Sequence, residues 1–191
     1  MSGLTTYDLR SITYGGIWKS LKRAMYYPYR LRTEFRDRRF TIVGDANGLR
    51  QLAVQFVLVA AHGQDVHLDS KDSDSGAWIL ESGTRIVIQD SKYSGLDRPP
   101  RLKRFRYDAK PILDPRMPTL RPNAECWSDS NDSFCIDGNL EALLSFTEHL
   151  FDLAEQRTLE GAEIRYEPGR QLLPDSIQFA FRRQSSYARG R

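Results

Sequence analysis

Cysteine and histidine are scarce in this sequence, which limits the chemistry that it can hold. There are two cysteines and three histidines among 191 residues. In a cytosolic protein we expect these cysteines to be free thiols, with Cys135 in a strand and Cys126 in a loop, and a disulfide between them is the alternative. None of the histidines (His62, His67 and His149) has a histidine or cysteine four residues further on, so a metal site is not indicated.

Long apolar runs are also missing. The run from Val57 to Ala61, even with Phe56 before it, is far shorter than the roughly 18 residues that a membrane-spanning helix needs. The N-terminus carries no apolar signal segment, so we expect a cytoplasmic protein with no membrane partner. The composition, 40% hydrophobic and 28% charged, is ordinary for a globular chain with a real core.

Sequence motifs of the common enzyme classes are absent. The chain has no Gly-rich phosphate loop of the Lys-Ser/Thr type and no nucleophile elbow. Ser82 and Ser176 each precede a predicted strand, where a serine typically makes a local turn hydrogen bond. We therefore predict a protein that is not an enzyme, with no catalytic residues and no cofactor.

A short acidic segment partly matches a calcium-binding loop. Asp69, Asp72 and Asp74 are followed by Gly76, as in the first half of such a loop. Counting from Asp72, however, the twelfth position is Gly83, where calcium binding requires a bidentate glutamate. We interpret the segment as a solvated acidic turn and predict no metal site.

What the sequence does contain is an internal repeat. The segment Phe40-Thr-Ile-Val-Gly44 recurs 94 positions later as Phe134-Cys-Ile-Asp-Gly138. Only 5 of the 21 positions from Phe40 onward are identical, so pattern rather than identity indicates the repeat. Each copy has the pattern of a strand, a glycine turn, a helix and two further strands. We predict an α+β fold of duplicated strand–helix–strand–strand units, with antiparallel sheets each packed by one long helix.

Apolar side chains recur at intervals of three and four in both predicted helices, over residues 47–62 and 139–156. In the first copy the stripe runs from Leu49 to Ala60, and Asp45 or Asn47 can cap the helix start. Gly63 stands where a helix C-cap is expected. Each helix therefore has one face suited to a sheet.

Composition divides the chain into five segments. Six of the nine prolines fall between the repeats, which predicts an extended connector with one strand at Leu102 to Tyr107. Before the first repeat, we expect a helix within Ile12 to Tyr26 and a strand from Arg30 to Arg39. The expected segments are a basic N-terminal helix and strand (1–38), a first repeat (39–90), a connector (91–132), a second repeat (133–182) and a basic tail (183–191).

Charge is distributed unevenly along the chain. The net charge of +3 combines +6 over residues 1–39, −7 over residues 40–176 and +4 over residues 177–191. The basic ends either pack on the acidic body or bind a partner. Arginine alternates with aromatic residues in Lys19 to Arg39 and in Lys103 to Tyr107, a pattern that suits single-stranded nucleic acid but also any half-buried strand.

Residues 39–90 carry a more specific pattern. It consists of a strand ending in glycine (Ile42 to Gly44), the run Gly48 to Ala53, a helix ending at Ala60, the Val-His-Leu-Asp strand from Val66 to Asp69, and Ser82 before an apolar strand. The pattern resembles the bacterial immunity proteins of polymorphic toxin systems known as immunity protein thirty-two. Residues 133–182 form a degenerate second copy, with Ile164-Arg-Tyr166 in place of the histidine strand.

This resemblance implies a non-enzymatic protein that binds and neutralises a cognate toxin protein. A basic toxin would dock on the acidic loop, and the candidate partner-binding residues there are Asp69, Asp72, Asp74, Trp78 and Glu81. The basic ends suit an acidic toxin instead, and the sequence leaves this choice open. The alternatives are a nucleic-acid-binding module that uses the basic aromatic segments, and a structural phage or secretion-system component.

Overall fold

The computed structural model describes residues 3–8, 30–63, 65–70, 78–81, 83–90, 101–113, 124–128 and 133–185. For residues 3–8, 70, 78 and 79 it describes the backbone alone. The helix expected within Ile12 to Tyr26 lies outside these ranges, as do Asp72, Asp74 and the end of the basic tail.

The described elements fall into two similar series, and together they confirm the α+β class. The first series is β2 (Leu31–Arg36), β3 (Arg39–Gly44), α2 (Ala46–His62), β4 (Val66–Ser70), β5 (Trp78–Leu80) and β6 (Arg85–Gln89). The second series is β8 (Ala124–Ser128), β9 (Ser133–Gly138), α3 (Leu140–Ala154), β10 (Glu163–Tyr166) and β11 (Gln178–Arg183). Outside both series are β1 (Gly3–Asp8) and β7 (Arg104–Ala109).

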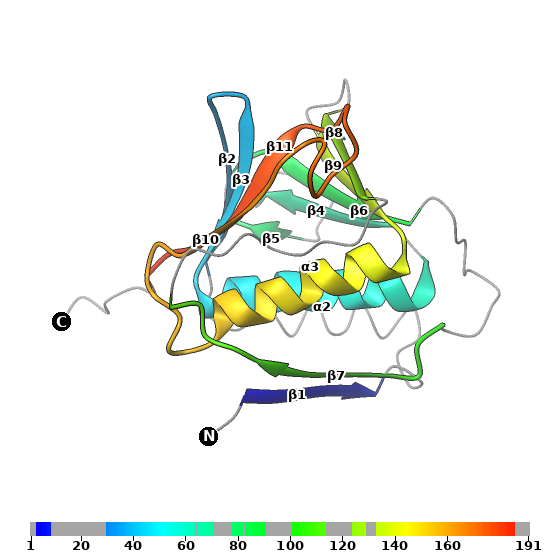
Figure 1. Cartoon of the computed structure of the whole chain (residues 1–191), viewed down its shortest axis with the longest axis vertical. Helices are drawn as coiled ribbons and strands as arrows, with labels where there is room; N and C mark the ends of the chain where they lie inside the picture. The colour runs from blue at the N-terminus through cyan, green and yellow to red at the C-terminus, as the bar shows by residue number, and fades with distance from the viewer. Residues whose placement is uncertain are drawn as a thin grey trace.

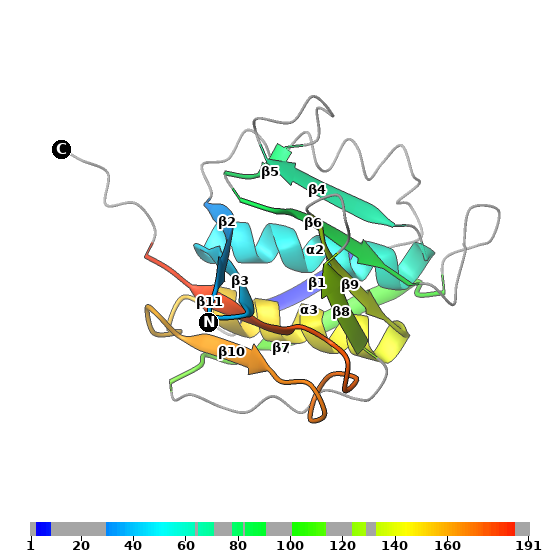
Figure 2. The same ribbon diagram turned by 90° about the horizontal axis from the view of Figure 1, so that it is seen from above.

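These elements stack in three layers (Figure 1). The top layer holds two sheets that are inclined toward each other (Figure 1). One has the strand order β10-β11-β3-β2 and the other the order β5-β4-β6-β9-β8. Helices α2 and α3 lie side by side beneath both sheets (Figure 2). The two-stranded sheet β1-β7 lies below α3, where Phe105 stacks on Phe151 and the Tyr107 hydroxyl donates to Asp152.

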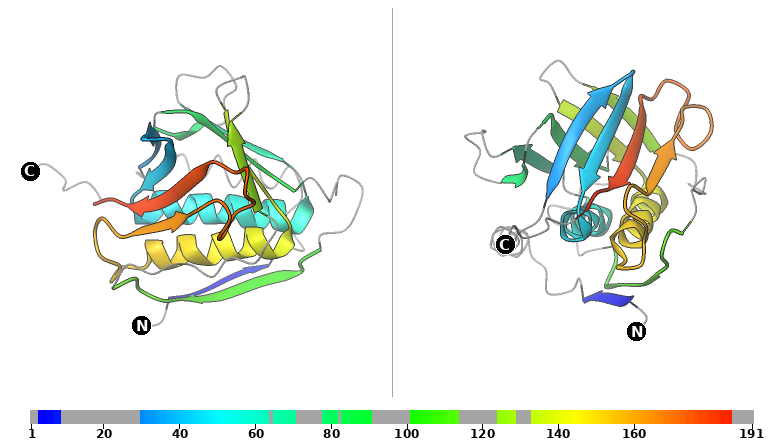
Figure 3. Two further views of the ribbon diagram at one scale, coloured as in Figure 1. Left: turned by 45° about the horizontal axis from the view of Figure 1, so that its top comes forward. Right: turned by 90° about the vertical axis from the view of Figure 1, so that its left-hand side faces the viewer.

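The two units share both sheets, which differs from two separate sheet-and-helix bodies. Four pairs within the units are antiparallel, as expected: β2–β3, β4–β6, β8–β9 and β10–β11. The short edge strand β5 differs, because it pairs in parallel with β4. The joints between units are parallel, with Phe40 of β3 opposite Phe179 of β11 and Ile86 of β6 opposite Phe134 of β9. Each complete sheet is therefore mixed, and each contains strands from both halves of the chain (Figure 3).

The duplication predicted from the repeat is visible in the strand–turn–helix segments. Strands β3 and β9, and likewise α2 and α3, begin 94 positions apart. The Asp45 side chain accepts from the Gly48 N–H at 2.7 Å, and the Asn139 side chain accepts in the same way from the Ala142 N–H at 2.9 Å. The corresponding residues Phe40 and Phe134 stack on each other with ring centroids 3.7 Å apart, so the two copies meet at their repeated phenylalanine.

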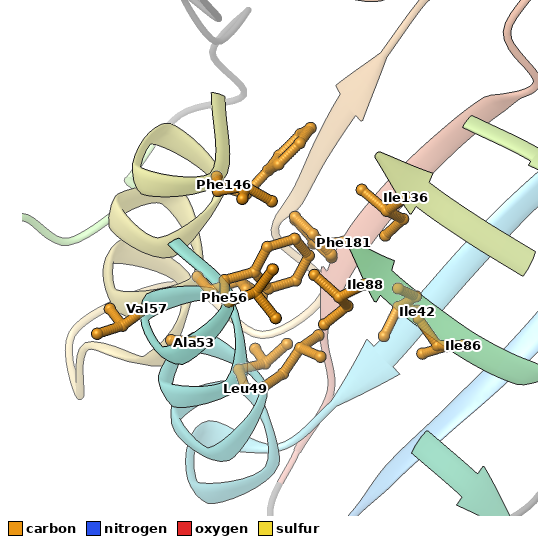
Figure 4. Close-up of a cluster of buried hydrophobic side chains, with 14 of the residues drawn as sticks. Ile42, Leu49, Ala53, Phe56, Val57, Ile86, Ile88, Ile136, Phe146 and Phe181 are labelled. Atoms are coloured by element: carbon orange, nitrogen blue, oxygen red, sulfur yellow. The ribbon is translucent and has the colours of Figure 1, made fainter. Parts of the chain in front are cut away.

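A single core lies between the helices and the two sheets (Figure 4). Alternation along the strands sends Ile42, Ile86 and Ile136 toward the helices, and the apolar stripes of the helices face back. Phe56 of α2 and Phe146 of α3 are 5.5 Å apart between ring centroids, with Phe181 of β11 next to both. None of the described helices is long and apolar enough to cross a membrane.

Residues Trp78 to Leu80 form the edge strand β5, which pairs in parallel with β4. One local prediction was wrong. Cys126 lies in strand β8 rather than in a loop. Both cysteines are buried and free, as expected.

Two positions in the fold require glycine, one because of its backbone conformation and one because of a close contact. Gly63 ends α2 in the left-handed region, with φ of 64°, and its N–H donates to the Val59 carbonyl. Gly48 lies in the first turn of α2, under the chain that enters β2. A Cβ atom on Gly48 would lie 2.0 Å from the carbonyl oxygen of Arg30, so only glycine fits there without movement of the backbone.

Candidate functional site: a sheet face lined with arginine

The basic ends of the sequence meet in one sheet. Strand β2, from the basic N-terminal segment, and strand β11, which leads to the basic tail, lie on either side of β3. One expectation was that the basic ends pack on the surface of the acidic body. Strands β2 and β11 are instead part of a sheet. Their charged side chains project from the same side of the four-stranded sheet.

The pairing identifies which residues share that side. Phe40, Ile42, Phe179 and Phe181 point into the core, so their neighbours in each strand point outward. We name this outward side the arginine face. Its charged members are Arg32, Glu34 and Arg36 of β2, Arg39 of β3, Arg182 of β11, and Glu163 and Arg165 of β10.

Four of these arginines and both glutamates form one connected set of ion pairs. Glu34 accepts from Arg32 at 2.9 Å and from Arg182 at 2.6 Å. Glu163 pairs with Arg165 at 2.5 Å, with Arg39 at 3.3 Å and with Arg182 at 3.9 Å. Arg182 of β11 thus connects the carboxylate on β2 with the carboxylate on β10. The set has more positive than negative members, so the face stays basic after all its internal pairing.

The ion pairs also explain why small residues occupy the middle of the face. Thr41 and Val43 point outward from β3 but are buried. The Arg32 side chain reaches across β3 to the Gln184 side chain, and Arg182 reaches back to Glu34, so guanidinium groups cover the central strand. Partial burial raises the pKa of Glu34, but the hydrogen bonds from Arg32 and Arg182 outweigh it, and the net pKa is lowered. Glu34 is therefore held in its charged form.

The turn between β2 and β3 extends the arginine face into solvent. We name residues Phe35, Arg36, Asp37 and Arg38 the hairpin tip; all four are exposed, and the Phe35 side chain is 60% exposed. Both central residues of the turn have positive φ, 51° at Asp37 and 60° at Arg38. The hairpin rises away from the helices at one end of the molecule (Figure 1).

The corresponding side of the other sheet has the opposite charge. Its outward residues include four acids, Asp65, Asp69, Glu125 and Asp137, and one arginine, Arg85. In the duplicated pairing Glu125 takes the place of Arg32. Burial raises the pKa of Asp65, and the nearby Asp137 and Asp90 raise it further against the opposing effect of His67. The outward side of one sheet is therefore basic, and that of the other sheet is acidic.

Two of the residues predicted to bind a partner, Asp69 and Glu81, form ion pairs within the protein instead. Asp69 is only 3% exposed and is paired with Arg85, so its carboxylate is not available on the surface. Glu81 accepts two hydrogen bonds from Arg30, both at 3.1 Å, at the start of β2. Trp78 begins edge strand β5, and its side chain is outside the described structure, as are Asp72 and Asp74.

Sequence reasoning missed the residues that form the arginine face. Arg32 and Arg39 lie before or at the first repeat, whereas Arg165 and Arg182 lie more than a hundred positions later. The signal that was available is the excess of positive charge at both ends, combined with the alternation in 30–39. What the sequence does not display is that β2 and β11 become neighbours of the same strand.

The remaining titratable groups with described contacts support the fold. His149 Nδ1 is 2.9 Å from the buried hydroxyl of Tyr166, and burial lowers the pKa of His149 to about 4. The Ser176 hydroxyl accepts from the Cys126 N–H. Within the described ranges, no three His, Cys, Asp or Glu side chains are grouped so that they could hold a metal ion.

The chain matches no protein-family model, no curated protein and no solved structure.

Proposed function

We propose that this protein is an immunity-type inhibitor that binds and neutralises a cognate toxin protein in the cytoplasm, and that the arginine face makes the contact. One observation carries the proposal: charged residues from both ends of the chain converge on one face and are held there by ion pairs. An inhibitor of this kind needs no chemistry of its own. It needs only a rigid surface that covers the working part of the toxin.

The composition of the face suits binding to a protein. Arginine is enriched at protein interfaces and among the residues that contribute most to affinity. The set of ion pairs holds Arg32, Arg39 and Arg182 in place before a partner arrives. Side chains that are already ordered lose less conformational entropy on binding, so more of the interaction energy appears as affinity.

Nucleic acid is the second candidate, because the face has more arginines than acids and arginine pairs with phosphate. Two features favour a protein over single-stranded nucleic acid. The outward positions in the centre of the sheet are Thr41, Val43 and Ala180, which offer no aromatic ring on which a base can stack. Glu34 and Glu163 also stand among the arginines, where they would repel a phosphate backbone.

The test is a co-expression experiment with the toxin encoded beside this chain. We expect the wild-type chain to rescue growth and to form a complex with the toxin on size-exclusion chromatography. The double variant Arg39→Glu, Arg165→Glu should lose both activities. A double variant at two arginines away from the face, Arg157→Glu with Arg170→Glu, is the matched control and should retain them. If the toxin kills equally with and without the wild-type chain, and no complex forms, the proposal is wrong.

A further inference from the structure

We propose that the hairpin tip is an insertion element, and that it enters a concave, acidic site on the toxin. The inference rests on the proposed function and specifies the chemistry of the partner. It follows from three properties of the tip: its backbone conformation, its exposed aromatic ring and a positive charge that has no ion pair among the described residues.

The backbone of the tip is strained, although a glycine in the turn would avoid the strain. Two-residue hairpin turns of this type require positive φ at both central positions, and Asn-Gly or Asp-Gly satisfies that requirement at low cost. Here the second position is Arg38, a long side chain that rarely adopts a φ of 60°. Strain of this kind persists mainly at functional sites. A glycine at position 38 would make a better turn, so the arginine side chain itself is the feature that needs an explanation.

Phe35 is exposed although it occupies a core-facing position. Along β2 it follows Leu31 and Thr33, which are both buried on the inner side of the sheet. Its neighbour across the hairpin is Phe40, which is also buried. The apolar side of the hairpin therefore continues past the edge of the core and ends in a bare aromatic ring. A ring in such a place is suited to a pocket on a partner, because burying it there removes apolar area from water.

Arg36 and Arg38 supply the charge of the tip. Both are exposed, and neither has an ion pair among the described residues, in contrast to Arg32 and Arg39 behind them. Asp37 is the single acid of the tip, so the tip carries a net positive charge. The complementary site is therefore acidic. It is also concave, because a two-residue turn is narrow and projects from the body (Figure 1).

The second half of the chain has a different sequence at the position that corresponds to the tip. Residues 129–132, which follow β8 and precede β9, read Asp-Ser-Asn-Asp. This sequence has two acids and no arginine or aromatic residue. Despite the duplicated fold, each chain should therefore bind one toxin molecule.

Calorimetric titration with a catalytically inactivated form of the toxin encoded beside this chain tests the inference. We expect one toxin per chain, and a loss of affinity of about 30-fold or more for Phe35→Ala, as for a truncated hot-spot residue. Arg36→Glu with Arg38→Glu should weaken binding at least as much. Arg38→Gly, which relieves the turn, should still fold and yet bind more weakly. Leu159→Ala is the matched control for the aromatic variant, since Leu159 is 54% exposed, and Arg170→Glu is the control for charge; neither should change affinity.

The outcomes separate the two proposals. If the toxin binds the wild type and all tip variants equally, the insertion element is wrong and the proposed function stands. If the toxin does not bind the wild type, both are wrong. A single-stranded 20-nucleotide DNA is titrated in parallel; tip-dependent binding to the DNA, without binding to the toxin, would refute an acidic protein partner.

Discussion

Replacing Arg38 with glycine should stabilise the protein, although the change deletes a whole side chain. The left-handed conformation costs a non-glycine residue about 1–2 kcal/mol, and glycine removes this cost. Glycine also gives the unfolded chain more freedom, which offsets the gain by about 0.4–1 kcal/mol. The expected net gain in the free energy of unfolding is about 0.5–1 kcal/mol, or a rise in Tm of about 1–4 °C for a chain of this size.

Thermal unfolding followed by circular dichroism measures this change, and Arg36→Gly is the matched control. Arg36 lies two positions earlier, in strand β2, where glycine should cost about 0.5–1 kcal/mol because it fits a strand poorly. The two variants remove the same side chain and the same charge, so opposite shifts in Tm isolate the backbone term. If Arg38→Gly lowers the Tm as much as Arg36→Gly does, the turn is not strained and the argument for the hairpin tip loses its main support.

Three further predictions concern stability. Gly48→Ala should destabilise the protein in urea unfolding, against the helix preference for alanine, because its Cβ meets the Arg30 carbonyl. Ala142→Gly at the corresponding position should cost about 1–2 kcal/mol, through helix propensity and the loss of a buried methyl group. His149 has a pKa of about 4 in the folded protein, below its ordinary 6.5, so the unfolded chain binds a proton more readily. The contribution of His149 to the free energy of unfolding should be complete above pH 6.5 and should fall by up to about 3 kcal/mol as the pH drops to 4. In unfolding measured at several pH values, His149→Gln should flatten this dependence. Glu34→Gln should cost no more than about 1 kcal/mol in the same assay, since the pairs are partly exposed, and a much larger loss would show that the ion pairs hold the sheet together.

Features that depend on neighbouring residues could be predicted from the sequence. The strand from Phe40, the cap at Asp45 and the end of α2 at Gly63 each follow from a few adjacent side chains, and the structure confirms all three. The repeat adds the second copy, because the same residue types recur at Asn139 and beyond. The α+β class then follows from counting the elements.

The pairing between the halves could not be predicted in this way. Nothing near Phe40 indicates that Phe179 will be its neighbour, because a parallel joint is decided by which edges meet after the units fold. The candidate site also depends on contacts between strands that are far apart in the sequence. The residues next to Asp69 in the sequence predict an exposed carboxylate. Only the position of Arg85 in the adjoining strand shows that this carboxylate is taken up by an ion pair within the protein.

Sharing of sheets between the halves has a consequence for synthesis. Strand β3 leaves the ribosome early, but its partner β11 is the last described strand to be made. At about 5–20 residues per second, the edge of β3 stays open for on the order of ten seconds during translation. An open strand edge is a site for aggregation, so the nascent chain depends on shielding during that interval. Arg182 arrives only with β11, and the arginine face is incomplete without it. A chain whose translation stops before Gln178 therefore lacks the joint between β3 and β11 and cannot form the complete arginine face.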